Sequence, residues 1–130
     1  LSNVKLRGCG TIKDIQTKLS EYAAKQPTGW IYGLGWDQDT LQEKRLLNRK
    51  DVDVIVSDRP VILLRACSHI GVLNSAALER MSITKDTPDP PGGKIDRDEN
   101  GEPTGILREK ALFNVKGTFY IDSGDSMREK

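Results

Sequence analysis

The sequence is poor in the side chains from which metal sites are most often built. Its 130 residues include one histidine, His69, and two cysteines, Cys9 and Cys67. One imidazole cannot form a His-rich metal cage, and the wide separation of the two cysteines matches no zinc or redox motif. We therefore expect no metal cofactor in this chain alone. We expect both cysteines to be reduced thiols, buried or half-buried, with a disulfide between them as the alternative.

The sequence also lacks an excess of charge of either sign and any long hydrophobic run. Twenty Lys and Arg residues face nineteen Asp and Glu residues, for a net charge of +1, so no charge excess indicates a nucleic-acid partner. The longest apolar run, Val61 to Leu64, is far shorter than the roughly 20 residues that cross a bilayer. No basic and apolar leader opens the chain. We expect a cytoplasmic protein with no membrane or nucleic-acid partner, and the first residue, Leu1, suggests an excised piece or a processed product.

Aromatic residues are scarce as well, at 5%, so aliphatic side chains must fill the one core that a chain of this length can form. Apolar residues at helical spacing predict a helix that begins after Thr11, with Thr11 and Asp14 as a capping box. Aromatic and β-branched residues predict a strand at Trp30 to Leu34. Gly33 and Gly35 indicate that another backbone or a ligand approaches this strand closely.

The middle of the sequence contains one ambiguous segment and one clear strand. Asn48 and Asp51 form a second capping signal, which favours a helix. The β-branched run Val54 to Val56 favours a strand instead, and both interpretations stay open. Four successive apolar residues, Val61 to Leu64, predict a strand that is covered on both faces. Asn74 is a suitable N-cap for a helix that follows it.

The C-terminal third contains a hairpin signal. Asn100 and Gly101 lie between two extendable segments, residues 94–99 and 102–107, and this pattern predicts a β-hairpin. A further helix is expected to start near Arg108. The order helix, strand, helix, strand, helix, hairpin, helix predicts a single mixed α/β (α+β) domain, with a small mixed sheet, flanking helices and the hairpin.

Two residues are candidates for catalysis. His69 follows the most apolar strand, and ligands of open α/β sheets bind outside the carboxyl ends of the strands. Its imidazole is suited to proton transfer near neutral pH; a capping or backbone-bonded histidine is the alternative. Glu109 ends the second hairpin segment, where a carboxylate can bind a metal or serve as an acid or base. A surface glutamate in the first turn of a helix is the alternative.

Three other patterns carry weaker signals. Trp36 and Asp37 can form an apolar wall with a polar handle, although burial of Trp36 in the core is the alternative. The Gly-Leu-Gly segment lacks the spacing of a phosphate-binding loop. The acidic segment that starts at Asp96 has Leu107 at its twelfth position, where a calcium loop needs a glutamate, so it is rejected as a calcium site.

Several motifs, in this order, resemble an internal stretch of amidohydrolase family 3, in the branch that includes N-substituted formamide deformylase. The resemblance covers about residues 11 to 113. The motifs are Gly33-Leu34-Gly35-Trp36-Asp37, Asp58-Arg59-Pro60-Val61, Ser68-His69 with Asn74-Ser75-Ala76-Ala77-Leu78, Pro90-Pro91-Gly92-Gly93-Lys94-Ile95, and Asp98 to Glu109.

The resemblance implies that the chain is a fragment of a larger enzyme. Family members are similar in having a metal-binding (β/α)₈ barrel that hydrolyses C–N bonds with a metal-activated water. Their zinc-type site uses a His-x-His pair, which this sequence lacks. We therefore expect residues 1–113 to be an insert or partial barrel domain, not a complete barrel, and residues 114–130 to be an unassigned tail. The parent would act on a small amide or formamide, and the chain alone would be catalytically incomplete.

The resemblance also implies roles for single residues. His69 precedes the Asn-Ser-x-Ala-Leu motif and, with Glu109 of the Gly-x-Leu-x-Glu motif, is a catalytic candidate; Glu109 is also the one metal-ligand candidate in the intact parent. The substrate-binding candidates are Trp36, Asp37, Arg65 and Asn74. The alternatives are a stand-alone module that binds a small molecule and a purely structural insert. A homodimer through exposed strand edges is a further expectation.

Overall fold

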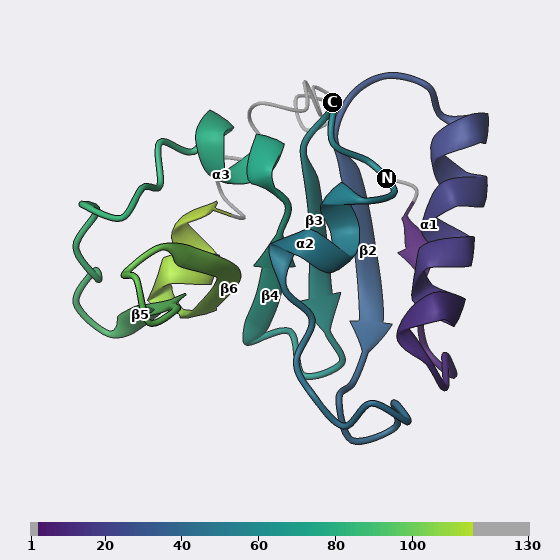
Figure 1. The fold of residues 1–130 in the computed structure, drawn as a ribbon, viewed down its shortest axis with the longest axis horizontal. Coiled ribbons are helices and arrows are strands. Elements are labelled where there is room, and N and C mark those ends of the chain that lie inside the picture. The colour runs from purple at the N-terminus through teal and green to yellow at the C-terminus, as the bar shows by residue number, and fades with distance from the viewer. Residues whose placement is uncertain (1–2, 116–130) are drawn as a thin grey trace, which may run out of the picture.

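Six strands form one mixed sheet in the order β1-β2-β3-β4-β6-β5 (Figure 1). The computed structural model describes residues 3–115, and within them the two outermost strands do not pair, so the sheet is not closed into a barrel. The strands are β1 Val4–Lys5, β2 Ile31–Trp36, β3 Val61–Arg65, β4 Ile70–Leu73, β5 Gly93–Arg97 and β6 Pro103–Glu109. The helices are α1 Ile12–Lys25, α2 Arg49–Asp53 and α3 Ser75–Arg80, and residues 110–115 are also helical. The predicted mixed α+β class is confirmed.

The strand directions give the sheet two distinct ends. β1, β2 and β3 are parallel, β4 is antiparallel to β3, and β6 is antiparallel to β4. β6 therefore runs in the same direction as β3. We call the end where β1, β2, β3 and β6 finish and β4 begins the carboxyl end of the sheet, and the opposite end the amino end.

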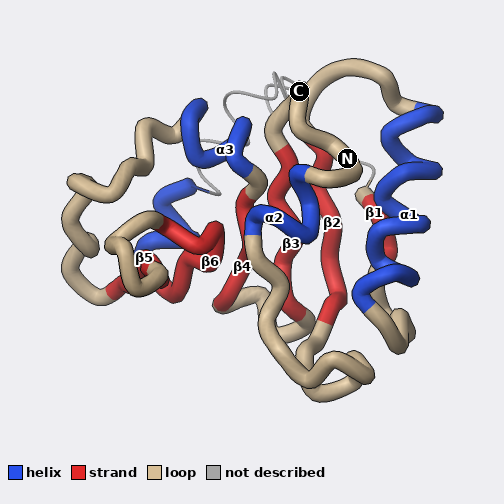
Figure 2. Tube along the Cα trace, in the orientation of Figure 1, coloured by secondary structure: helices blue, strands red, loops and turns tan. Residues whose placement is uncertain are grey.

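Helices cover both faces of the sheet, as Figure 2 shows. Val61 and Leu63 of β3 pack in one core with residues of α1 and α2, whereas Ile62 and Leu64 pack in a second core with α3 and residues 110–115. All four side chains are at most 1% exposed, which confirms the prediction of a strand covered on both faces. Burial of each such side chain contributes roughly 1.5–3 kcal/mol.

The N-terminal helix begins where the sequence predicts. The Asp14 main-chain N–H donates to Thr11 Oγ1 at 3.0 Å, and the Thr11 N–H donates to Asp14 Oδ2 at 3.2 Å. This reciprocal pair satisfies two of the N–H groups that a helix start leaves unpaired. The Ile12 N–H donates to the Glu43 carboxylate at 3.2 Å, so a carboxylate from the loop after β2 also occupies this helix start.

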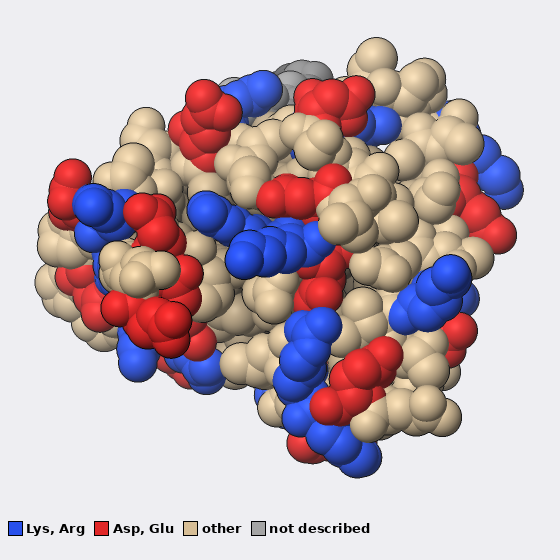
Figure 3. Space-filling model, viewed as in Figure 1, with Lys and Arg blue, Asp and Glu red and all other residues tan. Residues whose placement is uncertain are grey.

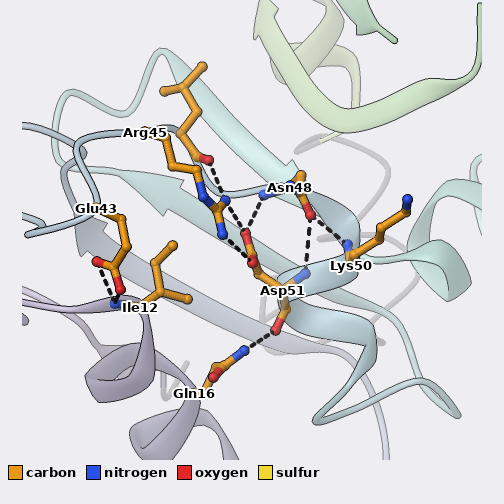
Figure 4. A network of polar contacts seen from close by, with 8 residues as sticks. Ile12, Gln16, Glu43, Arg45, Asn48, Lys50 and Asp51 are labelled. Atoms are coloured by element: carbon orange, nitrogen blue, oxygen red, sulfur yellow. Dashed lines mark hydrogen bonds and ion pairs between the residues drawn. The ribbon is translucent and has the colours of Figure 1, made fainter. Parts of the chain in front are cut away.

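The ambiguous segment is helix α2. Asn48 Oδ1 accepts from the Lys50 and Asp51 N–H groups at 2.9 and 3.2 Å, and the Asn48 N–H donates to Asp51 Oδ2 at 2.9 Å (Figure 4). Arg45 pairs with Asp51 at 2.8 Å, and Gln16 of α1 donates to the Asp51 carbonyl at 2.9 Å (Figure 4). The capping box therefore decides for a helix, and Asp51 in the first turn of α2 is also bonded to α1.

The alternative strand at Val54 to Val56 is wrong. Val54 is 72% exposed and Ile55 38% exposed, and only Val56 is buried. A β-branched run forms a strand where neighbouring strands cover it, and within residues 3–115 no strand pairs with this segment.

The predicted hairpin is β5 and β6. The Asp98 N–H donates to the Glu102 carbonyl at 2.9 Å, and Gly101 between them has a φ of +82°. Pro103, which has no N–H to donate within a ladder, is the first residue of β6, and β5 is the outermost strand. Two strands were not predicted: β1 has only two residues, and β4 contains Gly71 and is stabilised by pairing with β3 and β6.

A bulge in β2 explains the glycine pattern and the position of Trp36. The register between β2 and β3 shifts between Leu34 and Trp36, around Gly35, whose φ is +114°. A Cβ on Gly35 would lie 2.8 Å from the Arg7 main-chain nitrogen, which confirms the predicted close approach of another backbone. Because a bulge reverses the alternation of side chains, Leu34 contacts the second core while Trp36 lies in the first.

Two buried polar side chains join segments at the amino end of the sheet. The Arg59 guanidinium donates to the carbonyl oxygens of Gln26, Thr28 and Gly29, between α1 and β2. Asn74 connects the end of β4 to the segment before β3, through the carbonyl oxygens of Val56 and Arg59. Arg59 is 9% exposed and Asn74 is fully buried, so the Asn74 bonds are shielded from water and the Arg59 bonds are partly buried.

The surface and the termini add three observations. Acidic and basic side chains are interspersed over the face drawn in Figure 3. Residues 3–115 contain no helix with the length and apolar character that a bilayer crossing requires. From residue 116 onward, the tail that the sequence leaves unassigned lies outside the described residues.

Candidate functional site

Five of the six site residues predicted from the sequence lie at the carboxyl end of the sheet. β2 ends at Trp36 and is followed by Asp37, β3 ends at Arg65, His69 directly precedes β4, and β6 ends at Glu109. The sixth, Asn74, follows β4 and lies at the amino end. The strand directions thus bring Trp36 and Glu109, which are 73 positions apart in the sequence, to the same end of the sheet.

His69 and Glu109 form an ion pair or hydrogen bond, with Nδ1 and Oε1 3.2 Å apart. The pairing of Ile70 with Arg108 in the β4–β6 ladder sets this contact, because the next antiparallel pair outward is His69 with Glu109. The Glu109 N–H also donates to the His69 carbonyl oxygen at 2.9 Å. Both side chains are more than half exposed, at 58% and 55%, so the pair is accessible and contributes little to stability.

This geometry suits proton transfer. A carboxylate that accepts from Nδ1–H selects the imidazole tautomer in which Nε2 carries the lone pair. The Phe113 ring contacts the imidazole edge to face, with centroids 5.7 Å apart and planes at 68°. Glu109 and Phe113 therefore both limit how the imidazole can turn.

Arg65, at the end of β3, binds side chains of the loop that follows β2. Its Nε donates to Gln38 Oε1 at 2.6 Å, and its Nη2 lies 3.4 Å from Asp37 Oδ1 and 3.8 Å from Asp39 Oδ2. The hydrogen bond to Cys67 raises the pKa of Arg65, whereas desolvation lowers it. The pKa is raised further by the nearby charges of Asp37, Cys67 and Asp39. The guanidinium stays charged and is fixed in place by its neighbours.

Cys67 lies between Arg65 and His69 and was not predicted as a site residue. Its Sγ accepts from Arg65 Nη1 at 3.4 Å and from the His69 N–H at 3.3 Å. Both cysteines are free thiols, as expected, but Cys67 is exposed instead of buried or half-buried. Its spacing of two residues from both Arg65 and His69 was the available signal. We call Asp37, Arg65, Cys67, His69 and Glu109 the carboxyl-end cluster.

The acidity of Cys67 follows from the same contacts. Desolvation raises the pKa of its thiol, but hydrogen bonds from the His69 N–H, Arg65 and the Ile70 N–H, together with the Arg65 charge, outweigh it, so the pKa lies below its ordinary value. Cys9 shows the opposite: burial raises the pKa of its thiol. The two thiols of the chain therefore differ in both access and acidity.

Trp36 and Asn74 are buried instead of lining an open surface. Trp36 is 1% exposed, and its Nε1 donates to the Leu63 carbonyl oxygen at 2.7 Å. Asn74 is fully buried; its Oδ1 accepts from the Val61 and Ala77 N–H groups, and its Nδ2 donates to two carbonyl oxygens. Their hydrogen-bonding groups are used within the fold, and a contact of either with substrate stays a prediction.

The described residues do not fit a complete metal centre. Within residues 3–115, no three side chains of His, Cys, Asp or Glu lie close enough together to hold a metal ion. Most zinc sites in proteins need three or four such ligands, and the His69–Glu109 pair offers two. A metal would therefore need ligands from outside these residues, and Glu109 as a ligand stays a prediction.

Sequence comparison identifies the relatives of the chain. A model of the amidohydrolase family matches residues 1–123. The chain is similar to the putative amidohydrolase YtcJ of Bacillus subtilis (strain 168), with 46% identity over 63% of this chain and 16% of the relative. It is also similar to N-substituted formamide deformylase of Arthrobacter pascens, with 34% identity over 86% of this chain and 21% of that enzyme.

Solved structures agree with the sequence comparison. An uncharacterized metal-dependent hydrolase from Pyrococcus horikoshii OT3 matches with a TM-score of 0.66 and 33% identity, over 88% of this chain and 20% of that chain. A second one, from Pyrococcus furiosus, matches with a TM-score of 0.64 and 34% identity over the same shares. The chain thus spans about a fifth of the length of these relatives. The resemblance seen in the motifs is confirmed, and the chain belongs to the amidohydrolase family.

Proposed function

We propose that this chain forms part of the active site of a metal-dependent hydrolase that cleaves C–N bonds in small amides or formamides, and that it is catalytically incomplete alone. One observation carries the proposal: His69 and Glu109 pair at 3.2 Å at the carboxyl end of the sheet, beside the Arg65–Asp37 pair. The similarity to a formamide deformylase supports the bond type. The small share of each relative that the chain covers supports its incompleteness.

The chain's own residues would bind and orient a substrate and move a proton. Glu109 accepts from Nδ1 and orients the imidazole, so that Nε2 is the atom that hydrogen-bonds the substrate or accepts and returns a proton. Asp37 and Gln38 fix the Arg65 guanidinium, which offers a positive charge at the same end of the sheet. A zinc-type metal, bound largely by residues outside this stretch, would supply an activated water.

The direct test uses the longer protein that contains this segment. His69→Gln and Glu109→Gln are each expected to lower kcat for an N-substituted formamide by about 10²- to 10⁴-fold, the usual contribution of a general acid or base. Glu99→Gln is a matched control, because this exposed carboxylate lies in the β5–β6 turn at the amino end. If both site variants kept more than half of the activity while folding normally, the proposal would be wrong.

The incompleteness is tested on the 130-residue chain itself. We expect it to retain no stoichiometric zinc after dialysis into metal-free buffer and to release no amine from formamides or other amides. Metal analysis of the dialysed protein and an amine-release assay measure both. One zinc per chain, together with hydrolysis that a chelator abolishes, would contradict the prediction.

A further inference from the structure

Cys67 contacts two members of the carboxyl-end cluster through one atom. Its Sγ accepts from the guanidinium of Arg65 at 3.4 Å and from the main-chain N–H of His69 at 3.3 Å. Arg65 is the last residue of β3, and His69 precedes the first residue of β4. The sulfur therefore bridges the two sides of the turn that connects these strands.

The turn itself adopts a conformation that needs support. Its Ser68 N–H donates to the Arg65 carbonyl oxygen at 2.8 Å, and Ser68 has a φ of +65°. A residue with a side chain pays an energetic penalty at such positive φ values, and it remains there only where surrounding contacts fix it. The sulfur contacts on either side of Ser68 are contacts of this kind.

His69 is held at both of its main-chain polar groups. Its N–H donates to Cys67 Sγ, and its carbonyl oxygen accepts from the Glu109 N–H at 2.9 Å. Its side chain then reaches Glu109 through Nδ1. The position of the His69 Cα, from which the imidazole extends, is thus set by Cys67 on one side and by β6 on the other.

We propose that Cys67 is a positioning residue: its sulfur, by accepting the His69 N–H, holds the imidazole within hydrogen-bonding reach of Glu109. This inference rests on the proposed function, because it assigns Cys67 a part in the same site. Cys67 acts through His69 and is not itself the group that attacks or protonates a substrate.

The charge around the sulfur supports this role. Hydrogen bonds from main-chain N–H groups and from Arg65 lower the pKa of the thiol against the opposing effect of desolvation, and a sulfur with more thiolate character is a stronger acceptor. Serine keeps an acceptor at this position and alanine removes it. The pair of variants Cys67→Ser and Cys67→Ala therefore separates the hydrogen bond from the volume of the side chain.

The test is NMR spectroscopy of the 130-residue chain, with Glu109→Ala, which removes the acceptor of Nδ1, as the reference for a broken His69–Glu109 pair. In Cys67→Ala we expect the His69 amide proton to exchange about 3- to 10-fold faster, as for the loss of one hydrogen bond. We also expect the ¹⁵N resonances of the imidazole to move toward those of Glu109→Ala. Cys67→Ser is expected to keep both signals near those of the unmodified chain, and Cys9→Ala to leave them unchanged.

A second measurement needs no variant. Iodoacetamide converts the exposed Cys67 thiol to a thioether, with loss of iodide and a proton, while Cys9 is buried. The thioether sulfur is only a weak acceptor, so the His69 signals of the alkylated chain are expected to move in the direction seen for Cys67→Ala.

Unchanged His69 signals in both Cys67→Ala and the alkylated chain, with a clear response to Glu109→Ala, would overturn the inference and leave the proposed function standing. A Glu109→Ala variant that leaves the imidazole unchanged would also overturn it, because no pair would then exist to be positioned. Failure of the proposed function is seen separately, in the activity of the longer protein.

Discussion

At the scale of single residues, Asn74 and His69 show how neighbours in one motif take opposite roles. Both belong to the segment that carries the family resemblance. Asn74 is fully buried at the amino end and bonded within the fold, whereas the His69 side chain is 58% exposed at the carboxyl end. The four-residue strand between them, β4, carries the chain from one end of the sheet to the other.

Asn74→Ala is expected to destabilise the chain strongly. It would leave the N–H groups of Val61 and Ala77 and the carbonyl oxygens of Val56 and Arg59 without their partner. Each buried unsatisfied group costs roughly 1–3 kcal/mol, so we expect a loss of about 3 kcal/mol or more in the free energy of unfolding, measured by urea denaturation.

The matched comparison is His69→Ala. Because the His69–Glu109 pair is exposed, we expect the free energy of unfolding of this variant to stay within about 0.5 kcal/mol of that of the unmodified chain. An Asn74→Ala variant that loses less than about 1 kcal/mol would show that the four bonds do not stabilise the amino end.

The sequence was sufficient to select His69 and Glu109 and to place them at strand ends, but not to show that they touch. Their contact depends on the register of β4 against β6, and β4 was not predicted. Burial of Trp36 was one of the two interpretations left open by the sequence, but the bulge at Gly35, which places Trp36 on the face of the first core, was not predicted. Cys67 was overlooked because its spacing of two residues from Arg65 and His69 does not by itself show the contacts that its sulfur makes with both.

At the scale of elements, those with local signals were predictable and those stabilised by distant pairing were not. α1 and α2 each begin at a capping box that is visible in the sequence. The β5–β6 hairpin has its turn residues in place. β1 is stabilised by pairing with β2, and β4 by pairing with β3 and β6. The sequence of each short strand therefore does not differ clearly from that of a loop.

Gly105 of β6 is expected to tolerate no side chain. Its φ is +108°, and a Cβ there would lie 2.6 Å from the Leu73 carbonyl oxygen. Gly101 in the adjacent turn has a φ of +82° and open space around it. Gly105→Ala adds a backbone clash to the strain of about 1–3 kcal/mol that both variants share. We expect it to lose at least about twice the unfolding free energy of Gly101→Ala, measured by urea denaturation; equal losses would contradict this.

At the scale of the whole molecule, the outer side of β5 is covered by side chains. The Ile95 N–H donates to Asp89 Oδ1 at 3.0 Å, and the Ile95 carbonyl oxygen accepts from Arg97 Nη1 at 3.3 Å. Such cover prevents a second strand from pairing at this side. The dimer expected from exposed edges stays a prediction, and this strand would have to be uncovered to take part in it.

Asp89→Ala is therefore expected to promote self-association through β5, seen by sedimentation velocity over a range of concentrations. Asp89→Asn keeps an acceptor for the Ile95 N–H and serves as the control.

The same contact makes the cover of β5 dependent on pH. The hydrogen bond from the Ile95 N–H lowers the pKa of Asp89; desolvation opposes this shift, and the hydrogen bond and charge of Arg97 lower the pKa further. The stabilising contribution of a carboxylate with a lowered pKa is present above its unfolded pKa and lost as pH falls through its folded pKa.

Protonation weakens the bond from the Ile95 N–H but keeps an uncharged acceptor, so self-association of the unmodified chain should increase only in strongly acidic solution and should stay below that of Asp89→Ala. If Asp89→Ala sediments as the unmodified chain does at every concentration, this role of Asp89 is wrong.

The Arg59 and Asn74 bonds at the amino end make the two ends of the sheet unequal in their tolerance of substitution. Buried and partly buried polar bonds that join segments of the fold lie at that end, whereas the side chains of His69 and Glu109 at the opposite end are more than half exposed. Substitutions of exposed side chains usually change stability little, so the carboxyl end can accept sequence changes that the amino end cannot.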